Sequence, residues 1–333
     1  MLQVRLRGVK DIEISEVPEL APPKPGWAIV ETRAVGICGS EMHVYLGENP
    51  VLSPPLIQGH EFSGVIKALN GDSAFQIGDR VTVNPVVACG LCGSCREGKR
   101  YLCDDAYVIG GEVNGAFGGE LYVPIRNLVS ISDRLQFIDA TLIEPTSVAV
   151  HTVGGMSGQT VLIIGQGTIG LLCLQIAKLN GNRVITMDVS DEALAVSESL
   201  GSDKVINSKA QDAKNELAGF LGKDRLDVVI DAVCNPVTAN FAVSQVKKGG
   251  RITWVGIPKK AFEFDLVTLL CKEIRLFTSY LYSEEDFVRA RDLVQSGAMK
   301  TEEIISKVFP FSKAAEAFEY KRNTPSIKVV VER

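Results

Sequence analysis

The 333-residue sequence lacks a basic excess, because its 35 lysines and arginines are outnumbered by 40 aspartates and glutamates. Most nucleic-acid-binding proteins carry a clear positive surplus, so the formal net charge of −5 argues against a nucleic-acid partner. Internal repeats and low-complexity segments are also missing. With 46% hydrophobic and 23% charged residues the composition is that of an ordinary globular protein. The length favours about two domains.

An uninterrupted apolar run is missing as well. Residues 145–177 contain no Asp, Glu, Lys or Arg. A membrane-spanning helix needs about 20 predominantly apolar residues, whereas glycine, serine and glutamine interrupt this stretch at 154–159 and 165–167. It is better explained as the end of a helix, a turn, a buried strand and another helix. The first residues alternate polar and apolar side chains and lack the apolar core of a secretory signal, so we expect a cytoplasmic protein without a membrane partner.

The pattern of strand-like and helix-like runs changes twice along the sequence. Up to about residue 139 it is rich in strand-like runs separated by proline and glycine. Between residue 160 and about residue 271, strand-like and helix-like runs alternate, which indicates βαβ units and a parallel sheet. The tail, from about residue 282, contains two helix candidates and a final strand-like run at 327–332. Periodicity alone leaves open whether this tail completes the parallel sheet or returns to the first part.

A glycine motif, GQGTIG at 165–170, follows the first strand of the alternating region and opens a helix. In this context the three glycines permit a tight turn, close approach of the backbone to a pyrophosphate, and close helix–strand packing. The next strand ends in Asp188, whose carboxylate suits the ribose hydroxyls of NAD and repels the 2′-phosphate of NADP. The residues expected to bind NAD are Gly165, Gly167, Thr168, Ile169, Gly170 and Asp188.

Four of the eight cysteines lie within fifteen residues: Cys89, Cys92, Cys95 and Cys103. In a reducing compartment such a cluster indicates a metal rather than disulfides. Tetrahedral Zn²⁺ accepts four thiolates, and a site closed in this way is structural. A nucleic-acid zinc module is the alternative, but the balance of basic and acidic residues around the cluster disfavours it.

Sulfur, nitrogen and oxygen donors occur in three other segments. Cys38 lies in GICGSEMH, His60 and Glu61 lie in QGHEFSG, and Glu144 lies in LIEPTSVAVH. Each residue alone is weak evidence. Together they offer the mixed ligands of a catalytic Zn²⁺ with an exchangeable position. All three histidines of the chain fall in or beside these segments, which favours a functional role.

These motifs together resemble the zinc-dependent medium-chain alcohol and polyol dehydrogenases along essentially the whole chain. Within this family, the sequence looks most like the branch that acts on polyols, threonine and sugar acids. Within that branch, it looks most like the hexonate dehydrogenases that act on L-gulonate and L-galactonate. The resemblance implies an α/β protein with a GroES-like β-rich catalytic domain at 1–145 and 283–333, including a structural zinc lobe at 89–103. It implies a doubly wound Rossmann NAD-binding domain at 146–282. It also implies a homodimer or homotetramer, in which edge strands of the parallel sheet are candidates for pairing between chains.

The resemblance also implies individual roles at the catalytic zinc. Cys38 and His60 match the two constant ligands, while Glu61 and Glu144 match two nearby acids, either of which coordinates in different members. Glu144 stands where the Cys₂His type of site has its second cysteine.

The segment that follows Ile37 matches the proton-transfer segment of the family. Ser40 matches the hydroxyl that touches the substrate oxygen, and His43 matches the outer end of a proton relay. Glu41 replaces a more usual aspartate.

Three functions are compatible with the sequence. The first is oxidation of a secondary alcohol of a sugar acid or polyol with NAD. The second is the same chemistry on L-threonine, sorbitol or a simple alcohol. The third is a non-catalytic nucleotide-binding or redox-sensing zinc protein, which would hold one zinc per chain rather than two. An anionic substrate would need a cationic partner, which the sequence does not identify, although Arg126 and Lys24 are present.

Overall fold

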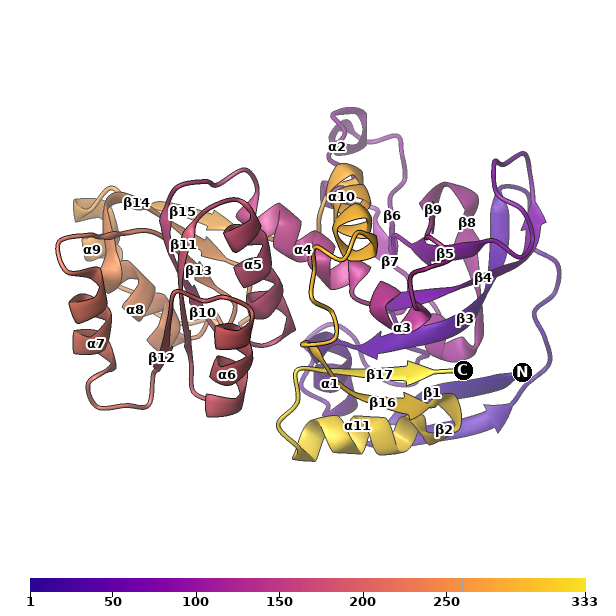
Figure 1. Ribbon diagram of the computed structural model, residues 1–333. Helices are drawn as coiled ribbons and strands as arrows, with labels where there is room; N and C mark the ends of the chain where they lie inside the picture. Colours follow the sequence, from indigo (N-terminus) through magenta and orange to yellow (C-terminus); the bar gives the residue numbers. More distant parts are fainter. Residues whose placement is uncertain (259) are drawn as a thin grey trace. The chain divides into compact units, whose positions relative to one another are not determined.

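The computed structural model describes residues 1–258 and 260–333, which form two compact units. The first unit comprises Met1–Ser147 and Leu281–Arg333, and the second comprises Val148–Tyr280. Both ends of the chain, indigo and yellow in Figure 1, therefore belong to the first unit. No helix in the described part of the chain combines the length and apolarity that a membrane span requires.

The main sheet of the first unit unites strands from both ends of the sequence. Its order is β16 (Ile305–Pro310), β17 (Lys328–Glu332), β3 (Trp27–Ile37), β4 (Glu61–Asn70), β5 (Arg80–Val83) and β9 (Leu128–Ser130), and β8 (Glu120–Pro124) also pairs with β3. Because β17 pairs antiparallel with the end of β3, with Val330 opposite Gly36, the tail returns to the first part of the chain. Figure 1 shows the yellow tail strands alongside β3. The question that periodicity left open is thereby resolved.

Shorter elements complete the first unit. Its two-stranded sheets are β1 (Leu2–Gly8) with β2 (Asp11–Glu16) and β6 (Val86–Val87) with β7 (Tyr107–Val108). Its helices are α1 (Gly39–Tyr45), α2 (Gly93–Arg96), α3 (Phe137–Ala140), α10 (Glu284–Gln295) and α11 (Ala314–Asn323), with single 3₁₀ turns at Arg100–Leu102, Ala116–Gly118, Ile125–Asn127 and Phe311–Lys313. Helix α4 (Ile143–Val153) contains the boundary between the units.

Aromatic packing fixes the tail against the sheet. Phe318 of α11 lies 5.3 Å from Tyr45 of α1 and 5.6 Å from Phe117, measured between ring centroids. All three rings are buried in one apolar core. Burial of such rings stabilises a fold by roughly 1.5–3 kcal/mol each. This packing holds α11 and the following β17 next to the end of β3, where the candidate metal ligands lie.

The second unit is built on a parallel sheet of six strands. Their order is β12 (Lys204–Asn207), β11 (Arg183–Asp188), β10 (Thr160–Ile164), β13 (Leu226–Asp231), β14 (Val246–Trp254) and β15 (Arg275–Thr278). The connecting helices are α5 (Thr168–Leu179), α6 (Asp191–Ser199), α7 (Ala213–Leu221), α8 (Pro236–Gln245) and α9 (Leu266–Cys271). The strand order reverses between β10 and β13. Ligands of doubly wound sheets bind at the carboxyl ends of strands beside such a switch point.

The alternating pattern of the sequence is confirmed in this unit, with two differences. Residues 246–250 follow α8 directly but begin β14 rather than extending the helix, and Gly249 takes a positive φ of 69° there. Strand β15 is also absent from the sequence-based expectation. It has four residues and is mostly exposed, so it lacks the apolar run that marked the central strands.

Candidate functional site

Three of the predicted metal ligands meet at the end of two paired strands of the first unit. Cys38 follows β3, and His60 and Glu61 stand at the start of β4. The pairing of Gly36 with Glu61 brings these ends together. One ligand atom from each of Cys38, His60 and Glu61 lies within 4.8 Å of the others. A soft sulfur, an imidazole nitrogen and a carboxylate oxygen form a donor set that fits Zn²⁺.

Glu41 connects two of these ligands. One carboxylate oxygen accepts a hydrogen bond from the backbone N–H of Cys38 at 2.9 Å, and the other lies 2.6 Å from Nδ1 of His60. The side chain of Glu41 is buried. Burial alone lowers the pKa of His60, but the charges and hydrogen bonds of Glu41 and Cys38 outweigh it and raise the pKa well above its usual range. With Nδ1 facing a carboxylate, Nε2 is left as the metal-binding nitrogen.

Glu61 has a buried cation of its own. The ammonium of Lys328, the first residue of β17, donates to both carboxylate oxygens of Glu61, at 2.8 and 2.5 Å. The two side chains are 2% and 1% exposed. Burial lowers the pKa of Lys328, but the negative charges of Glu61, Cys38 and Glu41 raise it above the ordinary value. Sequence reasoning missed Lys328, although a lysine within the apolar run IKVVV was a usable signal.

Glu144 occupies a different environment. It lies in the first turn of α4 and accepts a hydrogen bond of 2.8 Å from the hydroxyl of Tyr282, which is buried. Within the described residues, the group that shares the 4.8 Å spacing does not include Glu144. Burial raises the pKa of Glu144 to about 7, and the charge of Glu61 adds to this effect. Tyr282 is a second residue that the sequence did not identify.

Helix α1 carries the two predicted proton-transfer residues. Ser40 and His43 lie three residues apart on this helix, which begins directly after Cys38. The imidazole of His43 is 42% exposed, and its Nδ1 lies 3.2 Å from Glu48. An exposed imidazole on the helix that follows Cys38 can exchange protons with water.

The four clustered cysteines also come together. Their sulfur atoms all lie within 4.8 Å of one another, with Sγ separations from Cys89 of 3.5 Å to Cys103 and 3.9 Å to Cys95. Zn–S bonds of about 2.3 Å place tetrahedral ligands about 3.8 Å apart, so these spacings fit the ion. The backbone N–H groups of Leu91 and Cys92 point at Sγ of Cys89 and lower its pKa to about 7. These contacts favour the thiolate form of Cys89, whereas burial raises the pKa of Cys95 to about 12.

The glycine loop of the second unit has the shape expected for a dinucleotide. Gly165 has a φ of +89°, and a Cβ at Gly170 would collide with the carbonyl oxygen of Gly165. At Gly167, the N-cap of α5, a Cβ would meet no atom of the chain within 4 Å. Two of the glycines therefore serve the packing of the loop, whereas Gly167 leaves open space above the helix N-terminus. That space suits a pyrophosphate.

Asp188 closes the loop from the neighbouring strand. It ends β11, which pairs in parallel with β10. One carboxylate oxygen accepts from the backbone N–H of Gln166 at 2.5 Å, and the other accepts from Val189 and Ser190. These contacts fix the carboxylate beside the loop, and the oxygen that faces Gln166 has a further lone pair for a ribose hydroxyl.

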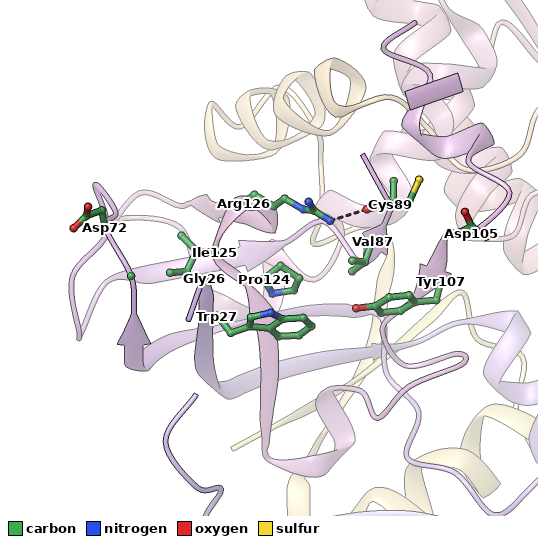
Figure 2. Close-up of a pocket in the computed structure, with 12 residues that line it drawn as sticks. Gly26, Trp27, Asp72, Val87, Cys89, Asp105, Tyr107, Pro124, Ile125 and Arg126 are labelled. Atoms are coloured by element: carbon green, nitrogen blue, oxygen red, sulfur yellow. Dashed lines mark hydrogen bonds between the residues drawn. The ribbon is translucent and has the colours of Figure 1, made fainter. Parts of the chain in front are cut away.

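The two cations noted in the sequence lie at a surface groove: Arg126 lines it, and Lys24 lies over Trp27, which also lines it. Arg126 belongs to a cavity of about 690 Å³ beside Cys89, which Trp27 and Tyr107 also line (Figure 2). Its guanidinium donates to the carbonyl oxygen of Ala88 at 2.6 Å. Lys24 lies over the ring of Trp27, 4.1 Å from its centroid. Neither cation belongs to the environment of Cys38 and Glu61, where the cations are Lys328 and Lys321.

Comparison with known proteins assigns both parts of the chain. Residues 24–133 match the model of the alcohol dehydrogenase GroES-like domain, and residues 168–296 match that of the zinc-binding dehydrogenases. The L-galactonate-5-dehydrogenase of Escherichia coli is 31% identical over 90% of this chain and 89% of its own length. The sorbitol dehydrogenase of Bacillus subtilis is 30% identical over 92% and 89%. A crystal structure of RspB from E. coli, described as a short chain alcohol dehydrogenase complexed with cofactor NADH, has a TM-score of 0.91 and 31% identity and covers 100% of this chain and 99% of its own.

Proposed function

Because the chain belongs to the zinc-binding alcohol and polyol dehydrogenases, we propose that it transfers hydride from a secondary alcohol of a hexonate, such as L-gulonate or L-galactonate, to NAD. The observation that carries this proposal is the group of Cys38, His60 and Glu61, whose ligand atoms lie within 4.8 Å of one another. A nucleotide-binding protein without catalysis has no need of this second donor set beside the four-cysteine cluster.

We assign the catalytic zinc to Cys38 and His60 together with a carboxylate of Glu61 or Glu144, and the structural zinc to the four clustered cysteines. When bound in a site with an open position, zinc acts as a Lewis acid that lowers the pKa of a hydroxyl group. Ser40 would accept the proton of the substrate hydroxyl at Oγ while its own hydroxyl proton is passed on to His43, whose exposed imidazole releases a proton to solvent. Glu41 keeps Cys38 and His60 aligned for this step.

The preference for NAD rests on Asp188. Its carboxylate beside the glycine loop offers acceptors to ribose hydroxyls and repels a 2′-phosphate. Residues 189–199, which follow it, contain no lysine or arginine to bind such a phosphate. The NADH complex of the RspB structure supports the same assignment.

The preference for a sugar acid rests on Lys321. Its pKa is lowered to about 8 by burial and by Lys328, while Glu61, Cys38 and Glu41 act in the opposite direction. Its ammonium donates to the carbonyl oxygen of Ile327 at 3.0 Å. We infer that this partly buried cation next to the metal group pairs with the substrate carboxylate. The similarity to an L-galactonate-5-dehydrogenase supports this substrate class, and the similarity to a sorbitol dehydrogenase supports a neutral polyol as the alternative.

A substrate panel tests this proposal. Zinc-loaded protein is assayed for NAD reduction with L-gulonate, L-galactonate, L-idonate, sorbitol, L-threonine and a simple secondary alcohol. We expect turnover with one or more hexonates, and Lys321→Met should raise KM for the hexonate more than KM for NAD. Lys321→Arg, which keeps the charge, should retain most of the activity. Turnover confined to sorbitol or L-threonine would instead identify the protein as a dehydrogenase for that substrate. No NAD reduction with any of the alcohols would contradict the proposed enzymatic activity.

For the assembly we infer a homodimer or homotetramer built through strand β15. This strand ends the parallel sheet, so its outer backbone groups are unpaired in the sheet. Exposed apolar side chains lie on the strand, just after it and on the preceding helix α9, namely Phe277, Tyr280, Leu266, Val267 and Leu270. An exposed edge with apolar neighbours is a typical interaction surface. Phe277→Arg should reduce the mass measured by light scattering to that of a monomer, whereas a monomeric wild-type protein would contradict the inference.

A further inference from the structure

We propose that the surface groove beside Cys89 is a binding site for a small aromatic carboxylate that also carries a hydroxyl or amino group. The groove lies entirely within the first unit, and neither Cys38 nor His60 lines it. The inference therefore goes beyond the proposed dehydrogenase function, and either one can fail without the other.

Regular structure holds the walls of this groove in place. Trp27 begins β3 where that strand pairs with the end of β8, and Tyr107 lies in β7, which pairs with β6. Arg126 lies in the 3₁₀ turn that follows β8, and its guanidinium is tied to the carbonyl oxygen of Ala88 at 2.6 Å. The enclosed volume of about 690 Å³ is that of a small-molecule site. Walls that are formed in advance reduce the entropy cost of binding.

Two aromatic rings form one side of the groove. Trp27 and Tyr107 are both only partly buried, and both also border a second cavity of about 270 Å³. Figure 2 shows the two rings on one side of the groove and Arg126 on the other. Large rings that border open space offer apolar faces on which a planar group can stack. This side of the groove therefore favours a ligand with a flat ring.

Arg126 supplies the charge that would recognise a carboxylate. Its side chain is exposed, and its hydrogen bond to Ala88 uses one of five N–H donors on a neutral carbonyl oxygen. Its positive charge reaches Tyr107, where it lowers the pKa that burial raises. A planar guanidinium matches the two oxygens of a carboxylate. A ligand stacked on the rings can thus place its carboxylate at Arg126.

Two acidic side chains restrict the charge of the ligand. Asp72 and Asp105 line the same groove, and both are exposed. Because they outnumber Arg126, a phosphate dianion would be repelled more than a monocarboxylate. A hydroxyl or ammonium group of the ligand can instead donate to one of these carboxylates. The balance of charges therefore favours a hydroxylated or amino-substituted aromatic acid over a nucleotide.

Calorimetric titration of the zinc-loaded, full-length protein with 4-hydroxybenzoate tests the proposal. We expect one site per chain. The neutral 4-hydroxybenzamide should bind about 10- to 100-fold more weakly, because it lacks the charge that Arg126 recognises. L-tryptophan serves as the amino-substituted acid, and the tighter of the two acids identifies the donor as hydroxyl or ammonium. Adenosine monophosphate should bind more weakly than both.

Two arginine variants locate the site. Arg126→Met should weaken binding of the acid by about 10- to 100-fold, whereas Arg96→Met should leave it within about twofold. Arg96 is a matched control, because it also donates to a carbonyl oxygen of the cysteine lobe, that of Leu91 at 2.7 Å, but does not line the groove. Zinc analysis of both variants reports whether the four-cysteine cluster is intact.

Fluorescence provides a readout that does not depend on an arginine variant. The chain has two tryptophans, so Trp254→Phe leaves Trp27 as the only one, and its emission should change as 4-hydroxybenzoate saturates the site. No heat and no change in emission with either acid would overturn the proposal. Equal binding of the amide, tighter binding of adenosine monophosphate, or equal weakening in both arginine variants would also overturn it.

A second copy of the chain is the other possible occupant of the groove. In that case Arg126→Met would change the mass measured by light scattering and the acids would not bind, which would contradict the proposal. NAD and alcohols are absent from every titration. Failure of ligand binding is therefore distinguishable from failure of the proposed dehydrogenase function.

Discussion

At the scale of single residues, Glu41 connects two proposed ligands of the catalytic metal that lie at the ends of different strands. Its carboxylate spans the backbone of Cys38 and the imidazole of His60, with contacts of 2.9 and 2.6 Å. Partners of this kind orient the ligands and fix the tautomer of the histidine. The extra methylene of glutamate, compared with aspartate, gives the side chain the reach for both contacts.

Glu41→Gln and Glu41→Asp should both weaken binding of the catalytic zinc by about 10- to 100-fold. The first change removes the charge that faces Nδ1 of His60, and the second removes the reach. Zinc affinity is measured by competition with a chelator, with Glu316→Gln as the control because Glu316 forms an exposed ion pair with Lys313. Unchanged affinity in both Glu41 variants would contradict the role of this residue.

Ser40→Ala should lower turnover strongly while zinc content stays at the wild-type level. We assign the hydroxyl to proton transfer, and it does not belong to the metal group of Cys38, His60 and Glu61. Loss of a general acid–base partner costs on the order of 10²–10⁴-fold in rate. The measurements are kcat and metal analysis on the same preparation. Loss of zinc with unchanged turnover would show that the assignment is wrong.

Lys321 gives the protein a stability term that depends on pH. Its pKa is about 8 in the folded state, below the ordinary 10.5. Between these values the unfolded chain binds more protons than the folded one, so the free energy of unfolding rises with pH across this window. Wild type should therefore gain on the order of 1–3 kcal/mol relative to Lys321→Met between pH 8 and pH 10.5. The comparison uses urea unfolding of both proteins without metal, and a constant difference across this range would contradict the shift.

The sequence predicted the donor types of the site better than the contacts that organise them. The sequence indicated Cys38 and His60, with Glu61 or Glu144, as candidate ligands, and of these Cys38, His60 and Glu61 lie together. Lys328 and Tyr282 were missed, because each comes from the tail and meets its glutamate only through long-range packing. Pairings between residues 61 and 328 or 144 and 282 leave no periodic trace in the chain.

At the scale of elements, different glycines of the loop between β10 and α5 serve NAD binding and packing. Gly167→Ala should fold normally, since a Cβ there meets no atom of the chain, but it should weaken NAD binding because the methyl group enters the space for the pyrophosphate. Gly170→Ala should lower stability by about 1–3 kcal/mol, because its Cβ collides with the carbonyl of Gly165. Thermal unfolding and NAD titration by fluorescence distinguish the two effects. Equal loss of stability in both variants would contradict this division.

Local patterns predicted the central elements of the second unit well and its edge poorly. Strands β10 and β13 are buried on both faces and appear as the apolar runs VLII and VVI. Strand β15 has four mostly exposed residues, so its place in the sheet depends on pairing with β14 rather than on its own composition. Such an edge strand cannot be distinguished from a loop by periodicity.

At the scale of the whole molecule, the protein combines a unit that carries both candidate metal groups with a unit that carries the glycine loop. The family, the α/β fold class and the dehydrogenase activity expected from the sequence are confirmed by matches along most of the chain. The return of the tail to the first unit depends on β17 pairing with β3, a contact between residues about 290 positions apart. Only the family resemblance anticipated this pairing.

Metal content per chain is the most direct test of the central claim that one zinc is structural and one is catalytic. We predict two zinc ions per chain in wild type and one in Cys38→Ser, which should keep its fold but show no NAD reduction with any alcohol. Cys38→Ser retains the four-cysteine cluster and therefore serves as its own control for the structural metal. One zinc per chain in active wild type, or full activity in Cys38→Ser, would contradict the account.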